Sequence, residues 1–149
     1  LLHGKRRAGA VDEGERVTYI GGSAEALPLR SELANQAWSL GVVAHIEDNE
    51  TFAQEVFRVL RPGGVFVLTE SFWEGHDAPR FARSAPQPWR ALRSTELVSV
   101  MKAAGLDRIE VGPWPGHGIS GSLDAVDPAM RADLADGRLV PLMITGYRP

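Results

Sequence analysis

Cysteine is absent from the 149 residues of this chain. Its absence excludes disulfide bonds, thiolate catalysis and cysteine-ligated zinc or iron–sulfur centres within the chain. It is also compatible with a reducing cytoplasm, where we expect the protein to act. No apolar run approaches the roughly 20 residues that cross a bilayer. The best candidate, Ala37–Ile46, is too short and contains Ser39 and His45, so we predict no association with a membrane.

Excess charge and recognisable metal or nucleophile motifs are lacking as well. The formal net charge is -3, which gives no electrostatic reason to expect nucleic acid as the main partner. Ser39 and Ser71 have no nucleophile-elbow sequence around them, so nothing supports hydrolase chemistry. No His/Asp/Glu set has metal-ligand spacing, and we predict no metal site. The histidines are scattered along the chain: His3, His45, His76 and His117.

Extended and helical patterns alternate along the chain, which indicates a single α/β domain. The first ten residues, Leu1–Ala10, are typical of the end of a basic helix. Val17–Ile20 is β-branched and aromatic, and two glycines follow it, so we predict a short strand. Gln36–Val43 is apolar and continuous, which is typical of a strand buried on both faces.

The strongest supersecondary signal is a helix, a glycine turn and a strand in succession. We predict the helix at Asp48–Leu60, because Asp48 can cap it and apolar residues recur at helical spacing. The turn Arg61–Gly64 (RPGG) ends it, since proline cannot continue a helix and glycine tolerates a left-handed turn. Val65–Thr69 then reads as a buried strand.

The second half of the sequence continues the alternation. We predict a helix at Ser94–Ala104, a strand at Asp107–Val111 and a short helix capped by Asp127. A final strand is expected at Leu139–Tyr147, where Pro141 favours an edge, a bulge or the start of the strand. The irregular segments between these elements are Ser71–Leu92 and Gly112–Ala125.

Four blocks of sequence, in this order and at this spacing, resemble the class I S-adenosylmethionine-dependent methyltransferases. The block VFRVLRPGGVFVLT is the specific one, and the others are individually weak. The branch that they resemble methylates small molecules such as quinones, sterols and natural products. The blocks are Gly21–Leu29 (GGSAEALPL), Ala37–Asp48 (AWSLGVVAHIED), Val56–Thr69 and Ser94–Val111.

The resemblance implies a doubly wound, mostly parallel, Rossmann-like sheet with ligands at the carboxyl ends of its strands. It implies S-adenosylmethionine as cofactor, and transfer of its methyl group to an O, N or C nucleophile of a small organic molecule. Residues 1–149 would then be the C-terminal two-thirds of a single methyltransferase domain, incomplete at its N-terminal side. A preceding segment, a homodimer or a partner subunit would supply the missing strands.

The sequence departs from the family pattern in ways that leave a second function open. No glycine-rich cofactor loop is present, Ser23 stands where the family has an acid that contacts adenine, and Asn35 stands where it has an aspartate. The strands would also leave a large apolar edge that needs a cover. The alternative is therefore a non-catalytic, methyltransferase-like module that binds a partner subunit.

The resemblance implies two groups of cofactor-binding residues. Ser23 and Ala24 would face the adenine, with Glu25 beside them, although the same residues could form a simple turn. The other group lies toward the end of the second predicted strand, where the family lines the methionine part of the cofactor. A glycine there allows close approach of the backbone, but the bland alternative is a buried strand. This second group is Ser39, Leu40 and Gly41.

His45 follows that strand and faces the expected reaction site. An imidazole, with an ordinary pKa near 6.5, suits a general base that removes a proton from the acceptor. The alternative is a histidine that only orders the next loop, because many methyltransferases work mainly by proximity and desolvation. The residues that could line an apolar substrate pocket are Phe72, Trp73, His76 and Trp89. Trp89 could equally only pin a proline-rich loop to the core.

Overall fold

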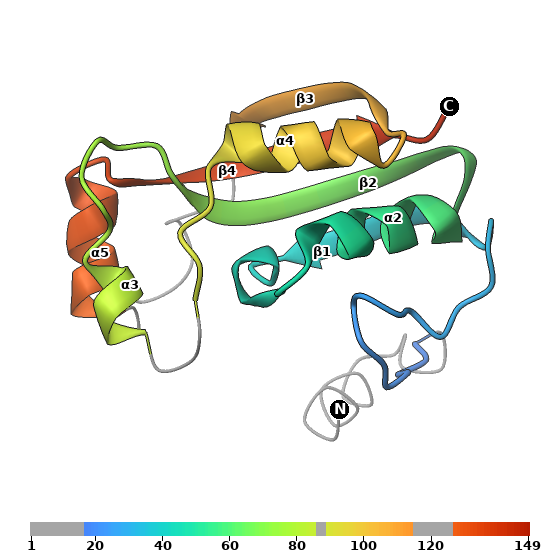
Figure 1. Cartoon of the computed structure of the whole chain (residues 1–149), viewed down its shortest axis with the longest axis horizontal. Coiled ribbons are helices and arrows are strands. Elements are labelled where there is room, and N and C mark those ends of the chain that lie inside the picture. The colour runs from blue at the N-terminus through green and yellow to red at the C-terminus, as the bar shows by residue number, and fades with distance from the viewer. Residues whose placement is uncertain (1–16, 86–88, 115–126) are drawn as a thin grey trace.

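The computed structural model describes residues 17–85, 89–114 and 127–149 (Figure 1). Within these ranges the strands form one four-stranded sheet in the order β1-β2-β4-β3. The predicted helix Leu1–Ala10 and most of the loop Gly112–Ala125 lie outside the described residues. The strands are β1 Ala34–Leu40, β2 Leu60–Trp73, β3 Asp107–Pro113 and β4 Leu139–Tyr147; the helices are the 3-10 helix η2 Val43–His45, α2 Asn49–Val59, α3 Phe81–Ser84, α4 Ser94–Ala103 and α5 Pro128–Ala135.

The α/β fold is confirmed, and the described sheet is mixed rather than mostly parallel. β1 pairs with β2 in parallel, whereas β4 lies between β2 and β3 and runs antiparallel to both. The β2–β4 ladder runs from Val65 opposite Tyr147 to Trp73 opposite Leu139. This places β2 in the interior of the sheet, with a neighbour on either side.

The prediction of a strand at Val17–Ile20 is wrong, because these residues have no regular secondary structure. Val17 and Ile20 are 47% and 55% exposed. A β-prone segment becomes a strand only where another strand supplies its ladder hydrogen bonds. Among the described residues β1 pairs with β2 alone, and no strand lies beyond it to receive this segment.

The second predicted strand, Gln36–Val43, is shifted and shorter, since β1 covers Ala34–Leu40. Gly41 adopts a positive φ of 63°, which ends the strand, and the chain turns into η2. The burial of β1 alternates rather than being continuous: Ser39 is 8% exposed, whereas Trp38 and Leu40 are 60% and 58% exposed. One face of this strand therefore belongs to the core, and the other carries large apolar side chains at the surface.

Helix α2 forms for the reasons seen in the sequence. The Asp48 carboxylate accepts hydrogen bonds from the backbone N–H of Glu50 and of Thr51, each at 3.0 Å. These bonds, with a third from the Thr51 hydroxyl, hold the pKa of Asp48 below its ordinary value. On the inner face Phe52 meets Phe66 of β2 edge to face, with ring centroids 6.0 Å apart. The cap and the apolar stripe thus fix the start and the orientation of the helix.

The RPGG turn is part of β2, which begins at Leu60. Gly63 has a φ of 76°, a conformation that side chains other than glycine disfavour. A Cβ on Gly64 would lie 2.8 Å from the carbonyl oxygen of Arg61 and 3.3 Å from that of Ala34. Both glycines are therefore required by the backbone, and the second allows β1 to approach the turn.

Helices α2 and α4 pack together and cover the same face of the sheet (Figure 1). The alternating β2 residues Phe66, Leu68 and Phe72 point into this layer and are at most 1% exposed. The predicted elements of the second half are confirmed as α4, β3, α5 and β4, each within two residues at its ends. Among the described residues no helix is long and apolar enough to cross a membrane.

Arg148 fastens the end of α2 to the last strand. Its guanidinium donates to the backbone carbonyls of Phe57, Arg58 and Leu60, and it forms an ion pair with Glu32 at 2.8 Å. The guanidinium carbon also lies 4.5 Å from the centre of the Phe57 ring. Carbonyls at the end of a helix have no partner within the helix, and Arg148 supplies donors to three carbonyls there, one of which, that of Arg58, also accepts from the backbone N–H of Glu32 at 2.9 Å.

Candidate functional site

Two segments that the sequence assigned to the site meet at one pocket. The loop after residue 22 and the η2 turn enclose a cavity of about 240 Å³, which we call the turn pocket. It brings the candidate cofactor residues Ser23, Ala24 and Glu25 together with the candidate base His45. Its complete lining is Ser23, Ala24, Glu25, His45, Ile46 and Glu47.

Local hydrogen bonds shape the loop that forms one wall of the turn pocket. The Ser23 hydroxyl accepts from the backbone N–H of Glu25 at 3.2 Å, and the Ser23 carbonyl accepts from Ala26 at 3.2 Å. The Glu25 carboxylate in turn accepts from the backbone N–H of Asp48 at 2.9 Å. The residues thus build a turn and tie it to the start of α2, which presents Ser23 and Ala24 at the pocket.

An ion pair between Glu55 and Arg58 on α2 binds the next part of that loop, residues 27–29. Glu55 accepts from the backbone N–H of Leu27 at 2.8 Å, and Arg58 donates to the carbonyls of Leu27 and Leu29 at 3.1 and 2.7 Å. The hydrogen bond from Arg58 lowers the pKa of Glu55. Arg58 therefore holds the backbone of residues 27–29 against α2.

A second, mainly apolar cavity of about 290 Å³ lies on the other side of the loop, and we call it the proline pocket. Ser23 and Ala24 line both pockets, so the two cavities adjoin at these residues. An apolar slot beside exposed backbone groups suits a flat aromatic ring. The lining of the proline pocket is Ile20, Gly22, Ser23, Ala24, Leu27, Pro28 and Leu29.

The second predicted cofactor group lies at the end of β1 and lines neither the turn pocket nor the proline pocket. Ser39 is buried toward the core, Leu40 is mostly exposed, and the backbone N–H of Gly41 donates to the carbonyl of Thr69 at 2.8 Å. That bond continues the β1–β2 pairing by one residue. In this structure the group therefore acts as the end of a strand.

Glu70 is the residue that the sequence analysis missed. It follows Thr69 on β2, is only 6% exposed, and accepts hydrogen bonds from the backbone N–H of Ser71 at 2.9 Å and of Ala44 at 3.3 Å. Burial raises the pKa of the Glu70 carboxyl, opposed by these two bonds and by the charge of His45. A glutamate directly after a buried strand was the available signal, because the carboxyl ends of strands carry the sites of this fold class.

The raised pKa of Glu70 predicts how stability depends on pH. Since its folded-state pKa exceeds the ordinary value of 4.5, the stability that it contributes is full below that value and is lost as the pH rises through the folded-state pKa. The Glu70→Gln variant cannot ionise at this position, so it should not lose this stability. Relative to the parent, its free energy of unfolding should rise between pH 4.5 and 8, by about 1.4 kcal/mol for each unit of pKa shift. Urea titrations of both proteins across this range measure the difference, and a flat difference would contradict it.

The predicted substrate residues do not gather in one pocket. Phe72 is fully buried in the core. Trp73 donates from Nε1 to the carbonyl of Asp77 at 2.9 Å and lies 4.1 Å beneath the Arg93 guanidinium carbon. Trp89 packs on the core beside Phe81, and His76 is exposed. Trp89 therefore packs its loop on the core, which is the alternative considered for it, and Trp73 binds the loop that follows β2.

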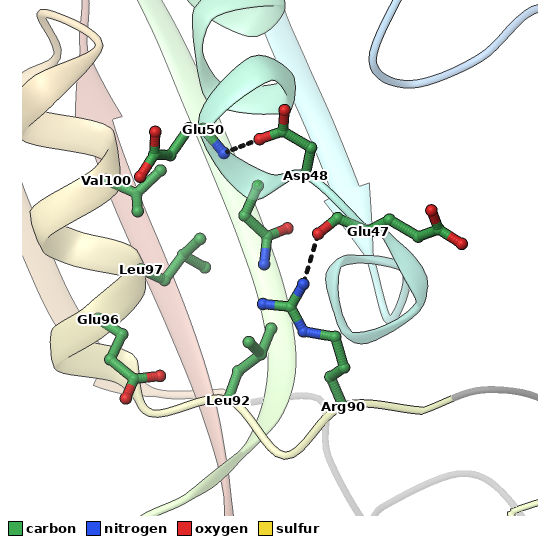
Figure 2. Close-up of a pocket in the computed structure, with 9 residues that line it drawn as sticks. Glu47, Asp48, Glu50, Arg90, Leu92, Glu96, Leu97 and Val100 are labelled. Carbon is green, nitrogen blue, oxygen red and sulfur yellow. Dashed lines mark hydrogen bonds between the residues drawn. The ribbon is translucent and has the colours of Figure 1, made fainter.

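A third cavity of about 250 Å³, the helix pocket, lies between the starts of α2 and α4 (Figure 2). The guanidinium of Arg90 donates to the carbonyl of Glu47. The backbone N–H of Arg90 donates to the carbonyl of Ala44 at 2.9 Å. Because Glu47 lines both the helix pocket and the turn pocket, the two cavities adjoin. The helix pocket is lined by Glu47, Asp48, Asn49, Glu50, Arg90, Leu92, Glu96, Leu97 and Val100.

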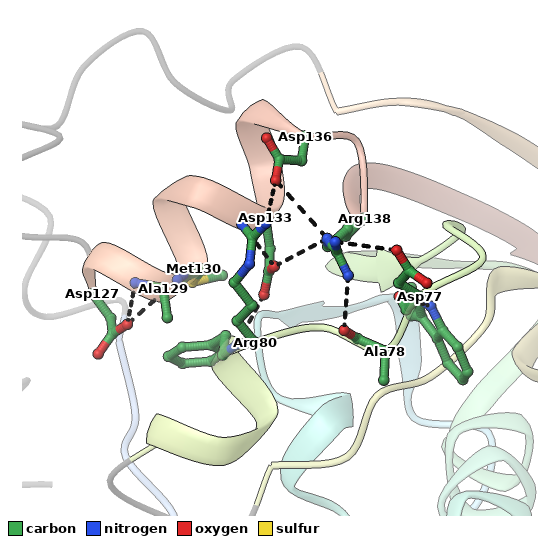
Figure 3. Close-up of polar contacts among 11 residues, drawn as sticks. Asp77, Ala78, Arg80, Asp127, Ala129, Met130, Asp133, Asp136 and Arg138 are labelled. Atoms are coloured by element: carbon green, nitrogen blue, oxygen red, sulfur yellow. Dashed lines mark hydrogen bonds and ion pairs between the residues drawn. The ribbon is translucent and has the colours of Figure 1, made fainter.

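An ion network joins the loop after β2 to α5 (Figure 3). Asp133 is fully buried and accepts from the backbone N–H of Phe81 at 2.8 Å. The guanidinium groups of Arg80 and Arg138 lie 3.8 and 4.0 Å from its other oxygen, and Arg80 also pairs with Asp136 at 2.6 Å. The two segments are thereby held as one unit. In the described ranges no cluster of three or more His, Cys, Asp or Glu residues could hold a metal ion.

Known proteins resemble this chain both in sequence and in fold. The profile of the methyltransferase domain family matches residues 3–68. A Mycolicibacterium smegmatis protein named as a probable S-adenosylmethionine-dependent methyltransferase is 33% identical over 115 residues, which are 74% of this chain and 43% of that protein. The chain thus spans less than half the length of this relative.

Solved structures show the same fold. Geranyl diphosphate C-methyltransferase from Streptomyces coelicolor, in a structure with S-adenosylhomocysteine, matches 98% of this chain and 57% of its own at 15% identity and a TM-score of 0.77. The [4+2]-cyclase SpnF matches 99% of this chain and 60% of its own at 20% identity and a TM-score of 0.69. At these identities the likeness shows the fold alone. The sequence of the chain thus matches the methyltransferase domain family and a probable S-adenosylmethionine-dependent methyltransferase, and its fold is that of solved S-adenosylmethionine-dependent methyltransferases.

Proposed function

We propose that the protein transfers the methyl group of S-adenosylmethionine to an O, N or C nucleophile of a small organic molecule. The observation that carries the proposal is the turn pocket, where Ser23, Ala24 and Glu25 meet His45. The proline pocket adjoins it at Ser23 and Ala24. The mainly apolar proline pocket therefore lies next to the turn pocket, which the His45 imidazole lines.

The residues around the two cavities fit this cofactor. The apolar walls formed by Ile20, Leu27 and Pro28 suit the adenine ring. The carboxylates of Glu25 and Glu47 in the turn pocket favour a cationic ligand, so they favour the sulfonium form over its neutral product. The bound cofactor supplies a methyl group already activated by its positive sulfur.

The chain's own contribution is alignment and proton removal. His45 accepts the proton of the acceptor atom as that atom forms its bond to the methyl carbon. The bound cofactor would supply the methyl carbon, and its sulfur would keep the electron pair of the bond that breaks. Holding both reactants in line accounts for most of the remaining acceleration.

We also propose that residues 1–149 form the C-terminal two-thirds of one methyltransferase domain. Two observations support it: among the described residues β1 pairs on one side only, and the Mycolicibacterium relative is more than twice as long as the part matched. The rest of the cofactor site would then come from the other part of that domain.

Calorimetry with the full-length protein tests the cofactor assignment. We expect S-adenosylmethionine and S-adenosylhomocysteine to bind, and Ser23→Tyr to weaken both at least about 30-fold, because the ring fills the junction of the two pockets. Ser99→Tyr, an equal change at an exposed position of α4, is the matched control and should leave both affinities unchanged. Failure of the parent protein to bind either compound at millimolar concentration would defeat the proposal.

A partner-binding module is the second candidate, and the exposed face of β1 favours it. Trp38, Leu40 and Val42 are 60%, 58% and 45% exposed and follow one another along the edge of the described sheet. Apolar side chains at an unpaired edge usually have a cover. Light scattering that shows a dimer or a larger complex, together with no cofactor binding, would support this candidate against the enzyme.

A further inference from the structure

The turn that carries His45 rests on a buried carboxylate. Glu70 accepts the backbone N–H of Ala44 at 3.3 Å with one oxygen and the N–H of Ser71 at 2.9 Å with the other. At 6% exposure it has almost no contact with water. A buried carboxylate lowers stability unless hydrogen bonds compensate for its lost contact with water. A role in the site would explain why a glutamate occupies this position.

The contacts of Ala44 show what the carboxylate holds. The backbone N–H of Ala44 donates to Glu70, and its carbonyl accepts from Arg90 at 2.9 Å. Both polar backbone groups of the residue before His45 are therefore fixed by other parts of the chain. The N–H of His45 itself donates to Val42 at 2.9 Å. These bonds leave the η2 turn little freedom, and they set where the imidazole can lie.

Charged groups from several elements lie near His45 or near the turn that carries it. Glu70 acts on it from β2, Glu25 from the loop before Asp48, and Glu47 from the segment that follows η2. Arg90 approaches the same turn from the loop before α4. Of the three carboxylates, Glu70 is the one shielded from solvent, so its field on His45 is screened least.

We infer that Glu70 is a positioning residue for His45: its bond to the backbone N–H of Ala44 holds the η2 turn so that the imidazole faces the turn pocket. The inference rests on the proposed function for its catalytic part. Its structural part, the coupling of Glu70 to the turn and to the imidazole, stands without it. Neither oxygen of Glu70 touches a reactant, and its effect passes through His45.

A double-mutant cycle in the full-length protein tests the catalytic part. Glu70→Gln should lower kcat about tenfold and leave the KM for S-adenosylmethionine within about twofold, because the amide keeps the shape of the side chain but not its charge. Adding Glu70→Gln to His45→Ala should cost less than about twofold more. Losses that multiply would mean that Glu70 acts independently of His45, and would overturn the inference. Glu110→Gln on β3, exposed in the structure, is the control for loss of a carboxylate.

A titration that needs no activity tests the coupling itself. The charge of His45 lowers the pKa of Glu70, so removal of the imidazole in His45→Ala should raise that pKa, as followed by carbon-13 NMR of the carboxyl group. His45 is exposed, and its replacement should leave the fold intact. An unchanged titration of Glu70 would overturn the inference even if Glu70→Gln fails to fold. If the parent shows no methyl transfer but Glu70 still responds to His45→Ala, the proposed function fails while the coupling stands.

Discussion

Replacing His45 with alanine is expected to lower kcat for methyl transfer about 100-fold and to change the affinity for S-adenosylmethionine less than about threefold. The imidazole lines the turn pocket from an exposed turn, so its removal takes away a proton acceptor without opening the core. A base that acts only as the proton leaves contributes to the transition state and little to cofactor binding. Single-turnover assays and calorimetry on the same preparation separate the two quantities.

The contrast between turnover and stability decides the role of His45. If it only orders the loop before α2, His45→Ala should lower activity and thermal stability together. A base predicts a different result, in which the melting temperature is unchanged and added imidazole restores part of the lost turnover. His45→Gln keeps polarity without a titrating group and should be as slow as His45→Ala. A glutamine variant with parental kcat would assign His45 a structural role.

Replacing Arg148 with alanine is expected to lower the free energy of unfolding by about 3 kcal/mol, since charge-assisted hydrogen bonds contribute about 1.5–3 kcal/mol each and do not add fully. The variant would remove the guanidinium donor from the carbonyls of Phe57, Arg58 and Leu60, of which that of Arg58 still accepts from the backbone N–H of Glu32. The Arg148 side chain is only 14% exposed, so water replaces it poorly. Urea unfolding of the parent and the variant, with comparison of the slopes, measures the loss.

Two further variants separate the geometry of Arg148 from its charge. Arg148→Lys keeps the charge but not the planar fork, and it should recover less than half of the loss. Arg108 also lies over an aromatic ring, 4.3 Å from the centre of Tyr147, but its side chain is 65% exposed. Arg108→Ala should therefore cost less than about 1 kcal/mol. Equal losses at the two arginines would show that the carbonyl contacts contribute nothing.

The elements that the sequence predicted correctly are those defined by local chemistry. Asp48 caps α2 whatever surrounds it, and the glycines of the RPGG turn are dictated by the backbone at that turn. Strand β4 matches its predicted limits, Leu139–Tyr147, because its apolar run ends in local breakers on both sides. In each case the signal and its cause lie within a few residues of each other.

The elements that it missed depend on distant parts of the chain. Val17–Ile20 has the composition of a strand but no neighbour to pair with in the described structure. The burial of β1 was overestimated because an apolar run does not reveal whether a second layer covers its outer face. Pairing and burial are properties of the assembled sheet, and a single sequence does not state them.

The sequence identified some residues of the candidate site and missed another, because their proximity depends on the fold. Ser23 and His45 belong to separate segments, and their meeting follows from the fold class and the order of strands. Glu70 was missed because its importance comes from a contact with Ala44, 26 residues away. A carboxylate that bonds to distant backbone leaves no spacing pattern of its own in the sequence.

The ion network around Asp133 restricts which segments can be exchanged between related domains. Arg80 and Asp136 are 56 residues apart in sequence yet form an ion pair, and Arg80 also lies near the buried Asp133. A graft of the loop after β2 from a relative would bring a new residue to position 80 and leave Asp133 with one counter-ion fewer. A buried carboxylate tolerates that loss poorly. Crossovers between residues 81 and 127 should therefore yield fewer folded chimeras than crossovers outside that interval, and loop and helix should be inherited together.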